Sequence, residues 1–160
     1  MEDRPRVTLG TGPYWLVDGV PTLLCGGSSE DNQFQWPPDR LAPELDLLAS
    51  CGGTFIRNTM SDRDEGDVKP YEYDGSRFAL DRFNDEYFRR LDTFLAETAK
   101  RGIVVQLTLW DQHDTTGEKW ESHYWNPDNN AISLRGSRLY EANDLYAVVA
   151  RRNALVLPYQ

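Results

Sequence analysis

The sequence lacks any long hydrophobic run. No apolar stretch approaches the roughly 18 residues that a membrane-spanning helix needs, so we expect no membrane partner. Cysteine is also scarce, because Cys25 and Cys51 are the only two, which is too few for a disulfide framework. We expect both thiols to be buried in a reducing compartment. The charged amino terminus, Met1 to Arg6, is followed by no apolar segment; without such a secretory signal we expect a cytoplasmic location.

Positive charge is in short supply. The chain has 17 Lys and Arg residues against 26 Asp and Glu residues, a net charge of -9. Such a surface repels phosphate backbones, so we expect no nucleic-acid partner. We interpret the acidic cluster at 62–67 as a solvated loop and not as a metal site. With 39% hydrophobic residues, the chain can bury the core of one globular domain over residues 1–160.

The amino-terminal part of the chain predicts a β-hairpin. Asp18-Gly19 stands between β-prone runs at 14–17 and 20–24. This dipeptide favours a type I′ turn, because glycine accepts the positive φ angle that such a turn requires. We place the hairpin at 7–24 and expect it to lead into a first buried strand.

Two helices alternate with two strands after the hairpin. Gly52-Gly53 and Gly102 end the two helices, and Asp39 can cap the start of the first. The second strand is so continuously apolar that we expect it to be covered on both faces. The expected elements are a helix from about 39 to 51, a strand at 54–59, a helix from about 84 to 101 and a strand at 103–110.

Long polar segments follow both strands. We expect loops at 61–77 and from 111 to about 143, and then an apolar element at 145–160 that leads into a helix near Asn153. Strands alternating with helices indicate βαβ units around a parallel sheet, and therefore an α/β fold. In barrels of this kind, the loops after the strands carry the function.

Arg57, in the strand at 54–59, is the first candidate functional residue. A strand buried on both faces does not easily hold a guanidinium group. The charge must therefore meet a carboxylate or open into a polar cavity. A structural ion pair and a functional role are equally compatible with this residue alone.

The end of the strand at 103–110 supplies a second group of candidates. Trp110 offers an apolar platform, while Asp111, His113 and Asp114 offer two carboxylates and an imidazole. Sugars suit such a group, because their CH faces stack on aromatic rings and their hydroxyls bond polar groups. These residues and His123 are also types that ligate metals, but no fixed-spacing motif is present. An ordinary polar strand end is the third interpretation.

The loop that follows is rich in aromatic and amide side chains. It could wall a sugar cleft or fold over and pack on itself, and Trp125, Asn126 and Asn129 are its candidate binding residues. Other motifs are absent, since the sequence contains no GxSxG, P-loop or GxGxxG pattern.

Together these segments resemble the amino-terminal part of the cellulase-like (β/α)8 TIM-barrel glycoside hydrolases, which belong to a clan of retaining glycosidases. The resemblance runs from about residue 8 to the end of the chain. It implies hydrolysis of O-glycosyl bonds without a cofactor or metal, and a partial barrel with the first three βα units at 22–160. The segments that carry it are Tyr14–Leu24, Leu47–Gly53, Phe55–Thr59, Val105–Asp114 and Trp125–Asn130.

The resemblance also implies roles for single residues. An Arg at the end of the second barrel strand usually supports the catalytic carboxylate, and Arg57 takes that place. A His near the end of the third strand usually contacts the sugar, and His113 or its neighbour Asp111 takes that place. The carbohydrate-binding residues that we predict are Arg57, Asn58, Trp110, Asp111, His113, Trp125, Asn126 and Asn129.

We expect no catalytic residue in the chain. The family's acid/base is a Glu, commonly after Asn, at the end of strand four, and its nucleophile is a Glu at the end of strand seven. No Asn-Glu pair is present, and a whole barrel takes about 250 residues. We therefore expect an incomplete barrel domain, the amino-terminal fragment of a glycoside hydrolase, that carries part of the sugar-binding cleft, lacks both catalytic Glu residues and is inactive by itself. The alternatives are a non-catalytic carbohydrate-binding partial barrel, a metal-dependent TIM-barrel hydrolase, and a protein that self-associates through its open sheet edge.

Overall fold

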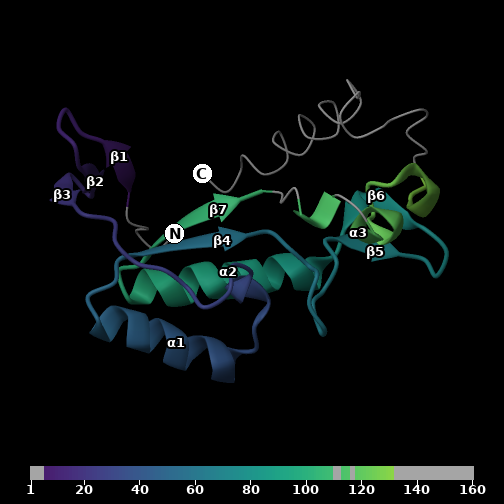
Figure 1. The fold of residues 1–160 in the computed structure, drawn as a ribbon, viewed down its shortest axis with the longest axis horizontal. Helices are drawn as coiled ribbons and strands as arrows, with labels where there is room; N and C mark the ends of the chain where they lie inside the picture. Colours follow the sequence, from purple (N-terminus) through teal and green to yellow (C-terminus); the bar gives the residue numbers. More distant parts are fainter. Residues whose placement is uncertain (1–5, 110–112, 116–117, 132–160) are drawn as a thin grey trace. The chain divides into compact units, whose positions relative to one another are not determined.

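A computed structural model describes residues 6–109, 113–115 and 118–131. The chain divides into two compact units, taken from Met1–Pro70 with Asn84–Gly117 and from Tyr71–Phe83 with Glu118–Gln160. Within the described ranges, helices combine with three small sheets and no closed barrel is formed (Figure 1). A mixed α/β fold is thus confirmed, while the partial barrel stays a prediction. The predicted element at 145–160 lies outside the described residues.

The predicted hairpin is present in the first unit. Strands β1 (Val7–Leu9), β2 (Trp15–Val17) and β3 (Val20–Thr22) form an antiparallel sheet, in which β1 is an addition to the prediction. Asp18 and Gly19 have φ angles of 50° and 80°, so both central residues of the turn are left-handed, as a type I′ turn requires. The turn prediction is confirmed.

Both predicted helices end where glycine can take a positive φ angle. After α1 (Pro38–Ser50), Gly52 has a φ of 78° and the Gly53 N–H donates to the Leu48 carbonyl at 2.9 Å. After α2 (Asp85–Lys100), Gly102 has a φ of 67° and the next N–H donates to the Thr98 carbonyl at 3.0 Å. Both ends are Schellman motifs, which satisfy the last carbonyls of a helix.

The two helices begin differently. The Asn84 side chain caps α2 by accepting a hydrogen bond from the Glu86 N–H at 3.1 Å. The capping role predicted for Asp39 is wrong, because α1 already begins at Pro38 and its cap residue, Pro37, makes no side-chain hydrogen bond. Asp39 instead lies in the first turn, where its charge suits the helix dipole.

The strands β4 (Phe55–Thr59) and β7 (Val104–Thr108) pair in parallel, with Arg57 opposite Gln106. Both helices lie on one face of this pair (Figure 1). On that face Ile56 packs with Leu45 of α1 and Phe94 of α2 in the main hydrophobic core. Arg57 and Gln106, which point to the other face, are exposed. The expectation that β7 is covered on both faces is therefore wrong for the described residues, since none of its side chains is fully buried.

The prediction of a first buried strand is wrong, because residues 25–31 form an irregular segment beside β4 that is exposed over residues 25–30. Near its start the Cys25 carbonyl accepts from the Thr54 N–H at 2.7 Å, and at its end the Asp31 carbonyl accepts from the Thr59 N–H. The segment therefore follows β4 in the same direction. At Gly26 the two backbones are so close that a Cβ atom would overlap the carbonyl oxygen of Phe55, so only glycine fits there.

The second unit holds elements that the sequence did not reveal. Strands β5 (Tyr71–Tyr73) and β6 (Phe78–Phe83) form an antiparallel hairpin, so the loop predicted at 61–77 is wrong in its second half. The loop predicted after 111 contains a short helix, α3 (Glu118–Ser122). Three buried aromatic residues form the core of this unit: Tyr71, Tyr124 and Trp125.

Two further expectations concern cysteine and membranes. Cys25 and Cys51 are both free and exposed, which corrects the prediction of buried thiols. Cys51 follows α1 directly, and Cys25 lies on the irregular segment 25–31. In the described ranges no helix combines the length and the apolar character needed to cross a membrane.

Candidate functional site

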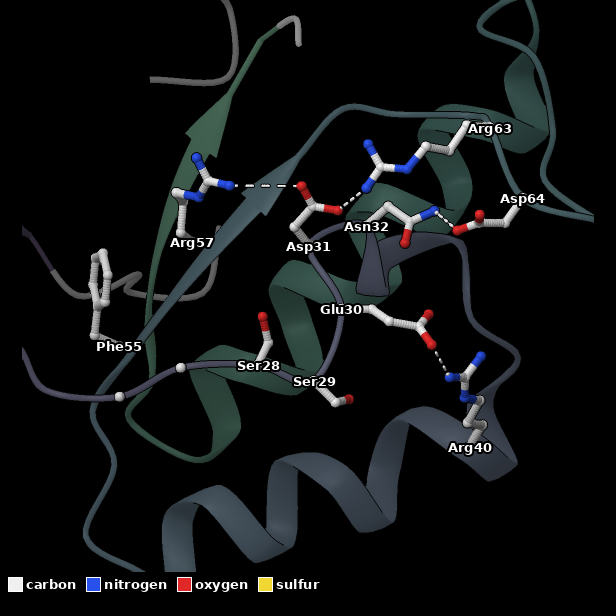
Figure 2. A pocket seen from close by; sticks show the side chains of 12 residues that line it. Ser28, Ser29, Glu30, Asp31, Asn32, Arg40, Phe55, Arg57, Arg63 and Asp64 are labelled. Carbon is white, nitrogen blue, oxygen red and sulfur yellow. Dashed lines mark hydrogen bonds and ion pairs between the residues drawn. The ribbon is translucent and has the colours of Figure 1, made fainter. Parts of the chain in front are cut away.

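A cavity of about 850 Å³ opens in the first unit beside β4 (Figure 2). Its walls are the segment 26–32, the face of β4 that the helices do not cover, the loop after β4, and Arg40 of α1. In α/β folds, ligands bind where parallel strands end and their loops begin. We therefore take this cavity as the candidate site.

Asp31 is the centre of a chain of charges in the cavity wall. Its carboxylate forms an ion pair with Arg63 and lies 3.6 Å from the Arg57 guanidinium, and it accepts a hydrogen bond from the Thr59 hydroxyl at 3.2 Å. Arg63 in turn lies 3.5 Å from the Asp114 carboxylate. These four charged side chains come from the segment 25–31, β4, the loop after β4 and the residues after β7. The chain of charges therefore ties together the loops at one end of three parallel segments.

Glu30 and Arg40 form a second charged pair in the cavity wall (Figure 2). The Arg40 guanidinium lies 2.8 Å from the Glu30 carboxylate and 3.6 Å from the centre of the Trp36 ring. The Trp36 indole N–H donates to the other Glu30 oxygen at 3.1 Å. An ion pair and a cation–π contact thus hold Arg40 in place.

Asn32 lines the cavity from a fully buried position, with only 1% of its surface exposed. Its amide Nδ2 donates to the carboxylates of Asp64 and Asp67, each at 2.9 Å. Its Oδ1 atom is buried and accepts no hydrogen bond from the described residues. Burial and the nearby carboxylates of Asp64 and Asp62 raise the pKa of Asp67, whose hydrogen bonds with Asp64 and Asn32 act in the opposite direction.

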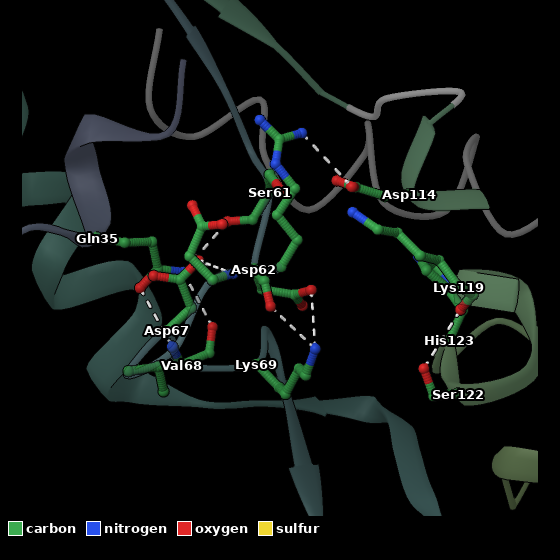
Figure 3. Close-up of polar contacts among 12 residues, drawn as sticks. Gln35, Ser61, Asp62, Asp67, Val68, Lys69, Asp114, Lys119, Ser122 and His123 are labelled. Carbon is green, nitrogen blue, oxygen red and sulfur yellow. Dashed lines mark hydrogen bonds and ion pairs between the residues drawn. The ribbon is translucent and has the colours of Figure 1, made fainter. Parts of the chain in front are cut away.

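The acidic cluster at 62–67 is more ordered than a solvated loop. Asp62 is only 8% exposed and forms an ion pair with Lys69 at 3.0 Å (Figure 3). The side-chain amide of the buried Gln35 donates a hydrogen bond to the Val68 carbonyl and accepts one from the Val68 N–H. The prediction of a solvated loop is therefore wrong for Asp62. Among the described residues no group of three or more His, Cys, Asp or Glu side chains could hold a metal ion.

The predicted site residues on β4 point to opposite faces. Arg57 lines the cavity, and 55% of its side chain is exposed. Asn58 is fully buried on the face toward the helices, where its Oδ1 accepts from the Phe34 N–H at 3.2 Å and its Nδ2 donates to the Thr59 carbonyl. These contacts give Asn58 a structural role, and no part of it reaches the cavity.

The predicted site residues of the second unit hold their own loop together. Trp125 is 4% exposed and its indole N–H donates to the Tyr71 hydroxyl at 3.4 Å. Asn126 caps a short 3₁₀ turn by accepting from the Asp128 N–H, and Asn129 donates to two backbone carbonyls. The loop thus packs on itself, which is one of the two interpretations that the sequence left open.

The predicted residues after β7 are only partly described. Trp110 and Asp111 lie outside the described residues. His113 is exposed and begins a 3₁₀ turn, His113–Thr115. The middle residue of this turn, Asp114, is buried and pairs with Arg63. The sequence reasoning missed Asp31 and Arg63, because ion pairs between distant loops leave no local pattern. The one sequence signal for this ion pair is that Asp31 and Arg63, a carboxylate and a guanidinium, both lie close to the ends of predicted strands.

Comparisons with known proteins identify a protein of similar fold but no family of related sequences. No protein-family model matches the chain, and no curated protein matches it. Among solved structures, the crystal structure of a "putative glycoside hydrolase" from Bacteroides vulgatus aligns with a TM-score of 0.60 and 18% identity. The alignment covers 74% of this chain and 26% of that protein, so the chain spans about a quarter of its length. At this identity the likeness concerns the fold alone.

Proposed function

We propose that the chain forms part of the carbohydrate-binding cleft of a glycoside hydrolase that acts on O-glycosyl bonds. The observation that carries the proposal is the cavity beside β4, where loops from three parallel segments meet. The likeness in fold to a protein named as a glycoside hydrolase supports it. On this proposal the segment 25–31, β4 and β7 are the first three strands of an incomplete (β/α)8 barrel.

The lining of the cavity has the chemistry that sugars require. Phe55 adds an aromatic ring to the wall, and Ser28 and Ser29 add hydroxyl groups. Charged side chains on both sides supply donors and acceptors for sugar hydroxyls. A mixture of one apolar face and several oriented polar groups is typical of small-molecule sites.

We propose further that the 160-residue chain binds carbohydrate without cleaving it. Retaining hydrolysis needs two carboxyl groups about 5–5.5 Å apart, one of them free to attack and one to donate a proton. Three carboxylates line the cavity, and all three are engaged: Glu30 and Asp31 by guanidinium groups and Asp64 by the Asn32 amide. Incubation of the purified chain with aryl glycosides and oligosaccharides should release no sugar. Release that is lost in Arg57→Ala would refute this part of the proposal.

A cavity-filling variant tests carbohydrate binding. A Cβ atom at Gly27 would meet no atom within 4 Å, so Gly27→Phe adds a ring at the cavity wall without a clash at its Cβ. Gly12→Phe is the matched control, because Gly12 is equally open and lies outside the cavity lining. We expect oligosaccharide binding, measured by titration calorimetry over a panel of neutral and acidic sugars, to be lost in Gly27→Phe and kept in Gly12→Phe. Equal binding by both variants would contradict the proposed site.

A further inference from the structure

Three guanidinium groups line the cavity, and they differ in their partners. Arg40 is held by Glu30 at 2.8 Å and by the Trp36 ring. Arg63 is 20% exposed and lies between the carboxylates of Asp31 and Asp114. Both groups are therefore committed to the protein itself.

Arg57 is the guanidinium that faces the cavity with donors to spare. Its described partner, Asp31, lies 3.6 Å away, which is too long for a hydrogen bond, and 55% of its side chain is exposed. The same Asp31 carboxylate is bonded more closely by Arg63 and by the Thr59 hydroxyl. A guanidinium has five N–H donors in a fixed fork, so most of those of Arg57 remain available to a ligand.

The surroundings of Arg57 favour a sugar that carries a carboxylate. A planar carboxylate matches the fork of a guanidinium with two parallel, charge-assisted hydrogen bonds. Phe55 lies two residues earlier on the same face of β4, so a sugar ring held over its side chain would direct a substituent toward Arg57. The net charge of -9 disfavours a densely charged polyanion, which leaves one discrete negative group at this position.

We infer that the cavity binds a glycan with a uronic acid unit and that the Arg57 guanidinium receives its carboxylate. This inference rests on the proposed function and narrows its substrate class. Asp31 is a positioning residue for it, because the ion pair keeps the Arg57 side chain directed along the cavity wall.

Titration calorimetry with matched trisaccharides tests the inference. One ligand is a trisaccharide with a single uronate unit, the second is the neutral trisaccharide of the same linkage, and the third is that neutral sugar with one sulfate group. We expect wild type to bind the mono-uronate trisaccharide most tightly. Arg57→Gln should weaken that binding about 10- to 100-fold, as the loss of charge-assisted hydrogen bonds implies, and should leave the neutral sugar within about twofold. Arg57→Lys keeps the charge without the fork and should give an intermediate loss.

The control variant is Arg82→Gln on β6. Arg82 is also an exposed arginine on a strand, with 59% of its side chain accessible and an ion pair of 3.2 Å to Glu72, but it lies outside the cavity lining. This variant should leave binding of the mono-uronate trisaccharide unchanged. If wild type binds the mono-uronate and the neutral trisaccharide equally tightly, the inference is overturned and the proposed function stands. Tighter binding of the sulfated sugar has the same consequence. Failure of all three sugars to bind overturns both.

Discussion

Gly26 provides the sharpest test of how the cavity wall is built. The wall exists because the segment 25–31 runs against β4, and the closest approach is at this glycine. A Cβ atom there would overlap the Phe55 carbonyl oxygen and lie 3.1 Å and 3.2 Å from the carbonyl carbon and the amide nitrogen of the same residue. All three are backbone atoms, so no side-chain rotation can relieve the overlap in Gly26→Ala.

The expected cost of Gly26→Ala follows from these contacts. Overpacking a close contact costs about 1–3 kcal/mol. Relief requires the segment to move away from β4, which weakens the neighbouring hydrogen bond from the Thr54 N–H to the Cys25 carbonyl, worth about 0.5–1.5 kcal/mol. We expect the free energy of unfolding to fall by about 2–4 kcal/mol. That is a large part of the stability of a typical domain.

Gly27→Ala is the matched control, because a Cβ atom at Gly27 meets nothing within 4 Å. Alanine at such a position restricts the unfolded chain and should stabilise by up to about 1 kcal/mol. Urea denaturation of wild type and both variants, followed by circular dichroism, gives the two differences. A Gly26→Ala variant within about 1 kcal/mol of wild type would show that the segment does not pack against β4 in this way.

Three further predictions concern stability and can be measured in the same way. Asp31→Ala removes the centre of the chain of charges and should lower the free energy of unfolding by about 2–3 kcal/mol. Glu72→Ala breaks an exposed ion pair and should lower it by less than about 1 kcal/mol. Equal losses in the two variants would refute a stabilising role for the chain of charges. Asn84→Ala removes the cap of α2 and should cost about 1 kcal/mol, largely restored in Asn84→Asp, and no loss would show that the cap is dispensable. Because burial raises the pKa of Asp67 in the folded state, its contribution to stability falls as the pH rises through that pKa. Asp67→Asn should therefore be more stable than wild type at pH 7, and this advantage should vanish as the pH falls toward 3.8; a constant difference would refute the shift.

Local signals made much of the fold predictable. The Asp18-Gly19 turn and the helix ends at Gly52 and Gly102 each need a positive φ angle, and glycine takes such an angle without strain. A glycine at these positions in the sequence therefore indicates the local structure. The polar stretch before the second helix hid the strand Tyr71–Tyr73, because only three residues pair and a register shift interrupts them. A short, irregular strand has no alternation long enough to recognise.

The site was harder to predict than the fold. Arg57 was recognisable, because a charge within an apolar strand needs an explanation. Its partner Asp31 was not, because 26 positions separate the two residues and only the parallel path of the segment 25–31 joins them. Trp125 illustrates the opposite error, since an aromatic residue in a loop has the same sequence signature whether it stacks on a sugar or fills a core.

The central claim is that carbohydrate binds in the cavity beside β4. The most direct measurement maps the residues whose backbone amide resonances change when a sugar binds. The nitrogen-15-labelled chain should be titrated with the tightest-binding oligosaccharide while its backbone amide resonances are recorded. We predict that the largest shifts fall on residues 26–32 and on the Arg57 and Arg63 amides, with little change in the hairpin Tyr71–Phe83 of the second unit. Shifts confined to that hairpin, or no shifts at saturating sugar, would contradict the claim.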